Sequence, residues 1–123
     1  MIMTVQRLHV EKRFSEIAIS GNLVHLAGQL ATDLSLDIKG QTQQTLDLID
    51  RFLADAGTDK KHIMSVMIFL KDIENDYVGM NEIWDAWCSD MQALPRTCVE
   101  AKLYRPDVLV EMTVVAVKPE EAQ

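Results

Sequence analysis

Two charged residues stand in segments that otherwise alternate like β-strands, Arg96 in LPRTCVEA and Glu111 in VLVEMTVVAV. The guanidinium group of arginine keeps its charge at any relevant pH and presents a planar fork of donors that matches a carboxylate or a phosphate. Arg96 follows a proline at the start of its segment, where an unpaired charge is costly. It therefore either forms a salt bridge with a neighbouring carboxylate of the protein or binds a small carboxylate ligand through two hydrogen bonds.

Glu111 is the only charged residue in its apolar segment. Burial disfavours the charged form of a carboxyl group, so Glu111 needs a cation or hydrogen-bond donors, or else its pKa rises and it becomes available for proton transfer. Two interpretations stay open. Glu111 forms a structural ion pair with Arg96 or Arg105, or it is a carboxylate that moves protons.

Cys98 lies two residues beyond Arg96 and hence on the same face of the predicted strand. A thiol is a good nucleophile only where its pKa is lowered, and no histidine is close in sequence, so a small buried side chain is the favoured interpretation. The histidines and cysteines also lack the spacing of metal ligands, and there is no phosphate-binding loop or dinucleotide fingerprint. The residue pattern therefore contains none of these metal or nucleotide motifs.

A hairpin is predicted at the start of the chain. Residues 15–31 read as two short apolar strands joined at Gly21-Asn22, a pair suited to a tight turn with positive φ. Near the end of the second strand, Gly28 marks either a point where a ligand approaches the backbone or a β-bulge.

The middle of the chain predicts a helix followed by a buried strand. Residues 32–40 have no clear period and are predicted as a loop. From Gln41 onward the apolar residues recur at helical spacing, and Gly57 is suited to end the helix. After a short helical turn, residues 65–71 read as a strand that is buried on both faces.

The remaining elements are a second helix and two strands. Asn75 or Asp76 is predicted to cap the helix, whose broad apolar stripe must pack against a sheet or another subunit, and Pro95 is predicted to end it. Residues 97–103 and 108–117 read as the closing strands.

This order of elements predicts a single domain over residues 1–123 with an α+β sandwich fold, in which both helices cover one face of a mixed six-strand sheet. The strands are too apolar for the other face to meet water, so a partner subunit is the simplest cover. The residue pattern by itself leaves the number of subunits open.

The composition is that of a folded protein, and we expect it to be located in the cytoplasm. Twelve lysine and arginine residues against 19 aspartate and glutamate residues give a formal net charge of -7, which disfavours nucleic acid as a partner. Charges interrupt the N-terminal segment, so we expect neither a signal peptide nor a membrane span. Two cysteines are too few for a disulfide framework and are expected to be free thiols.

The stretch LPRTCVEAKLYRPDVLVEM resembles the signature of the YjgF/RidA family, the reactive intermediate deaminases. LAGQLA is similar to the family's Ser-Gly-Gln strand end, IMSVMIFLKDIEND to its central strand and the following turn, and MNEIWDAW to its second helix. The resemblance therefore runs in order through most of the chain.

This resemblance implies a chorismate-mutase-like fold, a homotrimer, and active sites in the clefts between subunits. It also implies hydrolysis of enamines and imines, such as 2-aminoacrylate and its imine tautomer, to a 2-keto acid and ammonia, without a cofactor. The substrate would then be a small imine that carries a carboxylate.

Matched to the family position by position, Arg96 is the residue that grips the substrate carboxylate, and Glu111 is the carboxylate that positions or activates water. Cys98 matches a pocket-wall cysteine, Gly28 falls in the strand end that forms the pocket, and Asn81 on the second helix matches a position near the cleft.

Two hydroxyl groups common in the family are absent. Phe14 stands where many members have tyrosine, and Ala27 stands where serine is common before Gly-Gln. We therefore expect weak activity on the usual small imines, or a pocket that prefers a more apolar side chain. The alternatives to an imine deaminase are a binding module that holds a keto acid without turnover and, with less support, a ribonuclease or translation inhibitor.

Overall fold

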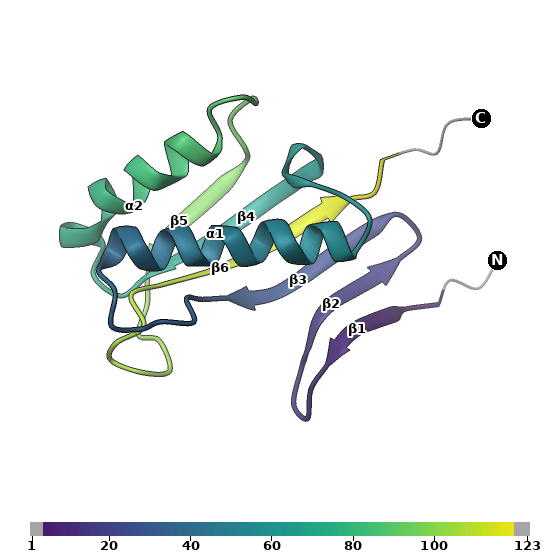
Figure 1. Ribbon diagram of the computed structural model, residues 1–123, viewed down its shortest axis with the longest axis horizontal. Coiled ribbons are helices and arrows are strands. Elements are labelled where there is room, and N and C mark those ends of the chain that lie inside the picture. The colour runs from purple at the N-terminus through teal and green to yellow at the C-terminus, as the bar shows by residue number, and fades with distance from the viewer. Residues whose placement is uncertain (1–3, 120–123) are drawn as a thin grey trace.

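The computed structural model describes residues 4–119 and contains one six-stranded sheet with two α-helices (Figure 1). In chain order the elements are β1 (Gln6–Val10), β2 (Ser15–Ser20), β3 (Leu23–Gln29), α1 (Ile38–Asp55), the 3-10 turn η1 (Lys60–His62), β4 (Ile63–Leu70), α2 (Ile73–Trp87), β5 (Arg96–Glu100) and β6 (Val110–Val117). The strand order is β1-β2-β3-β6-β4-β5, and only β4 and β5 are parallel neighbours. The predicted mixed sheet is confirmed.

Both helices lie on the same face of the sheet, as predicted, with α1 across its middle and α2 on the side of β4 and β5 (Figure 1). Alternate residues of the central strands point towards this helix layer and form the core with the inner faces of the helices. The most buried of these side chains include Val24, Leu46, Ile49, Leu53, Ile68, Leu70, Met80 and Met112.

Helix α1 begins earlier than its apolar period predicts and ends where predicted. Asp37 caps the first turn by accepting a backbone N–H three residues later, so the helix includes part of the predicted loop and starts before Gln41. At the other end Gly57 has a φ of +86°, a conformation that glycine adopts without steric cost.

Helix α2 is capped by Asp72, whose side chain accepts the backbone N–H of Asn75 at 3.2 Å. The predicted caps, Asn75 and Asp76, lie inside the first turn, so that prediction is wrong. The helix also ends at Trp87, well before Pro95, and an irregular segment joins it to β5.

The hairpin prediction is confirmed, because Ser20 pairs with Leu23 and Gly21 has a φ of +60°. The last two strands are shorter than predicted, with β5 ending at Glu100 and β6 beginning at Val110. No residue range was predicted for β1, since its side chains are nearly all exposed and give no apolar period.

The sheet face away from the helices carries a band of partly exposed apolar side chains. Strand pairing places Met67 beside Thr113 and Phe69 beside Glu111 on this face, opposite to the core positions of the same strands. We call it the open face. No helix among the described residues has the length and hydropathy needed to cross a membrane.

Candidate functional site

Arg96 lies at the first position of the edge strand β5 and points into the helix layer. It pairs with Val66, a core residue that is 2% exposed, so both side chains lie on the helix side of the sheet. The Nη2 atom of Arg96 donates to the Tyr77 hydroxyl at 3.3 Å, and Nη1 lies 3.9 Å from Met80 Sδ. The guanidinium carbon is 5.2 Å from the centre of the Trp84 ring, a cation–π contact.

No carboxylate of residues 4–119 forms a salt bridge with Arg96, so the interpretation as a structural salt bridge is not supported. The rings of Tyr77 and Trp84 stabilise the positive charge of the guanidinium group, but they leave most of its N–H groups without a hydrogen-bond acceptor. Of the five N–H donors on an arginine, one contacts an oxygen and one a sulfur. The remaining donors are able to bind a carboxylate ligand.

Two other predicted site residues lie on this side of the sheet. Cys98 pairs with Ile68 and is partly buried against the core. Burial raises the pKa of its thiol, and the positive charge of Arg96 lowers that pKa only in part, so Cys98 is suited to line a wall and not to act as a nucleophile. Asn81 lies on α2, one turn after Tyr77, and its buried Oδ1 atom has no hydrogen-bond partner among the described residues.

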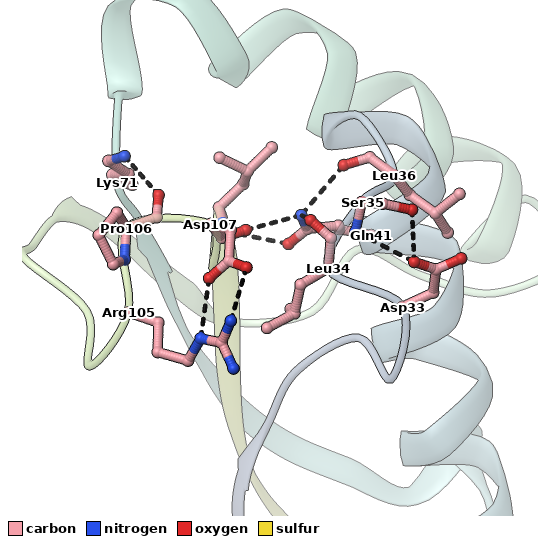
Figure 2. Close-up of polar contacts among 10 residues, drawn as sticks. Asp33, Leu34, Ser35, Leu36, Gln41, Lys71, Arg105, Pro106 and Asp107 are labelled. Atoms are coloured by element: carbon pink, nitrogen blue, oxygen red, sulfur yellow. Dashed lines mark hydrogen bonds and ion pairs between the residues drawn. The ribbon is translucent and has the colours of Figure 1, made fainter.

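Glu111 lies on the open face, because it pairs with Phe69 while its neighbours along β6 point into the core. Burial raises the pKa of its carboxyl group above the ordinary value. Arg105 instead forms a two-pronged ion pair with Asp107, at 3.1 and 3.0 Å (Figure 2). Within one chain, the described residues therefore give no support to the interpretation of Glu111 as a structural ion pair with Arg96 or Arg105.

Gly28 lies beneath the Glu111 side chain. The pairing of β3 with β6 shifts by one residue between Leu26 and Gln29, which identifies the predicted β-bulge. A Cβ atom at Gly28 would overlap the carboxylate of Glu111. The bulge therefore brings a bare stretch of backbone against the carboxylate, and a side chain at position 28 would displace the Glu111 carboxylate.

Phe14 follows β1 in the turn before β2 and lies at the same end of the sheet as Gly28, since β2 begins where the antiparallel β3 ends. The ring is 53% exposed and lines a hollow of about 720 Å³ together with Tyr104 and the neighbouring turn residues. No contact joins Phe14 to Arg96 within one chain.

A buried glutamine fixes the loop that leads to Glu111. The Nε2 atom of Gln41 donates to the carbonyl groups of Leu36 at 3.1 Å and Asp107 at 2.9 Å, and its Oε1 accepts the N–H of Leu109 at 3.0 Å (Figure 2). Lys71 donates to a carbonyl group of the same loop, that of Pro106. The start of β6 is therefore held in place from α1.

Sequence reasoning missed Tyr77 and Gln41. Tyr77, Met80 and Trp84 recur at helical spacing, which predicts one common face of α2 but not that this face meets Arg96. For Gln41 the sequence indicates only the start of a helix, because the contact of its side chain with the loop before β6 is long-range and leaves no local signal.

Comparisons with known proteins agree with this architecture. The family model described as Endoribonuclease L-PSP matches residues 4–118. A RutC family protein of Haemophilus ducreyi is 41% identical over 112 residues, which cover 91% of this chain and 95% of that protein. The RutC family protein YoaB of Escherichia coli is 38% identical over 114 residues, covering 93% and 98% of the two chains.

A solved structure of a YjgF family member from Neisseria meningitidis superposes with a TM-score of 0.92. It is 36% identical, and the match covers 97% of this chain and 98% of that one. The chain belongs to the YjgF/RidA family. The site residues that the sequence predicts form two groups, with Arg96, Cys98 and Asn81 on the helix side.

The second group of this YjgF/RidA chain comprises Glu111 and Gly28 on the open face, with Phe14 at the same end of the sheet. Arg96 is three residues along β5 from the level of Glu111 and two strands away, which corresponds to about 10 Å in each direction. The sheet itself separates their side chains. Within one subunit the two groups cannot contact the same small molecule.

Proposed function

We propose that the protein hydrolyses reactive enamine and imine intermediates, of the 2-aminoacrylate and 2-iminopropanoate type, to 2-keto acids and ammonia. Arg96, which has no carboxylate partner among residues 4–119, supports this function, as does the half-buried carboxyl group of Glu111 with its raised pKa. Membership of the YjgF/RidA family supports it further.

In the proposed reaction, Arg96 holds the substrate carboxylate, which fixes the imine carbon in place. Water adds to that carbon, and Glu111 accepts a proton from the water as the C–O bond forms. Glu111 passes that proton to the imine nitrogen, which gives a carbinolamine with one C–OH and one C–NH2 group. Glu111 then takes the hydroxyl proton and delivers it to the nitrogen, so that the C–N bond breaks, ammonia leaves and the carbonyl group of the 2-keto acid forms. A raised pKa suits this double role, because a carboxyl group with a pKa closer to the working pH is both a better acceptor and a ready donor of protons.

The position of Arg96 and Glu111 on opposite faces of the sheet supports a site that lies between two subunits. If both act on one substrate, Arg96 must come from one subunit and Glu111 from another. We therefore propose a homotrimer with the site between subunits, in which a neighbouring copy covers the open face. The exposed apolar side chains Met67 and Val99 would be buried there.

The function is tested by the rate of keto-acid formation when an amino-acid oxidase or a dehydratase generates imines in the presence of a chemical trap. The wild-type protein should accelerate keto-acid release, and Arg96→Ala should abolish the acceleration while leaving the fold unchanged. Equal rates for the two proteins would contradict the assignment.

Mixed oligomers test whether the site lies between subunits. Arg96→Ala and Glu111→Gln should each be inactive alone, but a 1:1 mixture refolded together should regain about a quarter of the wild-type activity. One intact Arg96 then meets one intact Glu111 at about a quarter of the interfaces. The control mixes Arg96→Ala with the double variant Arg96→Ala/Glu111→Gln. This mixture contains no intact Arg96 and should remain inactive. A mixture without recovery would argue against the shared site.

Binding of a keto acid without turnover is the second candidate function. Its support is the lack of hydroxyl groups at Phe14 and Ala27, together with an arginine that is suited to bind any small carboxylate. Wild-type protein that binds pyruvate but leaves the imine rate unchanged would favour this module. The family model carries an endoribonuclease description, but a net charge of -7 disfavours a nucleic-acid partner.

A further inference from the structure

The Tyr77 hydroxyl has a proton available for a ligand. This oxygen accepts a hydrogen bond from Arg96 Nη2 at 3.3 Å. A phenol that accepts from a guanidinium group must point its own proton elsewhere, because arginine cannot accept a hydrogen bond. No described residue accepts that proton, and the side chain is 40% exposed at the surface.

The geometry places this hydroxyl next to the proposed carboxylate position. Arg96 is held between two rings, with its guanidinium carbon 5.2 Å from the centre of the Trp84 ring and 5.8 Å from that of Tyr77. These contacts restrict the orientation of the guanidinium fork. A carboxylate bound to the free edge of the fork therefore lies within reach of a hydroxyl that already contacts Nη2.

We propose that Tyr77 is a substrate-binding residue whose hydroxyl donates a hydrogen bond to the carboxylate held by Arg96. This inference rests on the proposed function and names a further residue of the same site. It assigns to α2 a hydroxyl of the kind that is absent at Phe14 and Ala27. The ligands that fit are planar 2-imino and 2-keto acids.

The test is isothermal titration of the intact protein with pyruvate, which carries the carboxylate but undergoes no deamination. Tyr77→Phe keeps the ring and removes only the hydroxyl, so the Kd should rise about tenfold, as for the loss of a hydrogen bond to a charged group. Val78→Ala serves as the control on the same helix, because this neighbouring side chain is 68% exposed, and its Kd should match that of the wild type.

A double-mutant cycle shows whether Tyr77 acts on the same carboxylate as Arg96. If it does, Tyr77→Phe should weaken pyruvate binding in the wild-type background and have little further effect in Arg96→Ala. Equal effects of Tyr77→Phe in both backgrounds would overturn the inference. In the imine assay Tyr77→Phe should raise KM by a similar factor and change kcat less, since the interaction holds the substrate before and during the reaction.

The outcomes separate this inference from the proposed function. Arginine-dependent imine hydrolysis with an unchanged pyruvate Kd in Tyr77→Phe would overturn the role of Tyr77 and leave the function standing. Wild-type protein that neither binds pyruvate nor hydrolyses imines would overturn both. A tenfold higher pyruvate Kd in Tyr77→Phe, with a normal circular dichroism spectrum, would support the assignment.

Discussion

At the scale of single residues, Glu111 and Gly28 form one unit, because the Glu111 carboxylate occupies the space that a side chain at position 28 would need. Gly28 does not have a positive φ, so alanine is compatible with its backbone. We predict that Gly28→Ala displaces the carboxylate and lowers kcat of imine hydrolysis by about tenfold or more, as expected when a catalytic group moves by about 1 Å. Gly28→Ala combined with Glu111→Asp, which has a shorter side chain, should recover part of the rate. A fully active Gly28→Ala protein would show that the close contact has no role in the reaction.

The buried carboxyl group of Glu111 should also make the fold less stable as pH rises. Because burial raises its pKa above the ordinary 4.5, the folded protein binds more protons than the unfolded chain between the ordinary and the raised value. The stability contribution of Glu111 is complete below pH 4.5 and is lost as pH rises through the raised pKa. We predict that Glu111→Gln, although inactive, unfolds at higher urea than the wild type at pH 7, and that the difference disappears near pH 4. The exposed Glu11→Gln variant is the control and should not show this pattern.

At the scale of secondary-structure elements, the loop before β6 depends on one buried side chain of α1. Replacing Gln41 by Met keeps the volume but removes the hydrogen-bond partner of the Leu36 and Asp107 carbonyls and of the Leu109 N–H. We predict that Gln41→Met lowers the free energy of unfolding by about 2–4 kcal/mol, as expected when three partly buried backbone groups lose their partner. Gln43→Met is the matched control, since Gln43 lies two residues along on the exposed side of α1 and bonds only Asp47. A similar urea midpoint for both variants would contradict this role.

The elements that were predicted well are those with a local signal. Gly57 ends α1 and Gly21 makes the hairpin turn, because both positions require a positive φ that glycine adopts freely. The cap of α2 was misplaced because Asp72, Asn75 and Asp76 are equally good caps by residue type. Only the structure shows that Asp72 accepts the N–H of Asn75.

The side of the sheet on which a residue lies was harder to predict. The alternating pattern places Arg96 and Cys98 on one face of β5 but does not say whether that face meets the helices. Which face of β5 meets the helices depends on its parallel register with β4, in which Arg96 pairs with the core residue Val66. For this reason the sequence suggested both residues of the site, Arg96 and Glu111, but not that the sheet separates them.

At the scale of the whole molecule, the open face is the surface that the neighbouring copy covers in the proposed homotrimer. Met67 on β4 is 37% exposed beside Thr113 and lies on the face opposite to both helices. A charge buried in an apolar interface without a partner is strongly unfavourable. We therefore predict that Met67→Glu dissociates the proposed trimer into folded monomers, which analytical ultracentrifugation would detect as a decrease in mass relative to the wild type.

The Met67→Glu monomers should lose imine hydrolysis as well, even though Arg96 and Glu111 are both intact, because no second subunit brings them together. Pyruvate binding separates the two halves of the site. If Arg96 and Tyr77 form the carboxylate site within one subunit, the monomers should still bind pyruvate, with some loss of affinity for contacts that the neighbour supplies. Val78→Glu places the same charge on the exposed side of α2 and should leave both mass and activity unchanged. Monomers with full activity would contradict the shared site, because a small substrate would then have to reach both faces of one sheet.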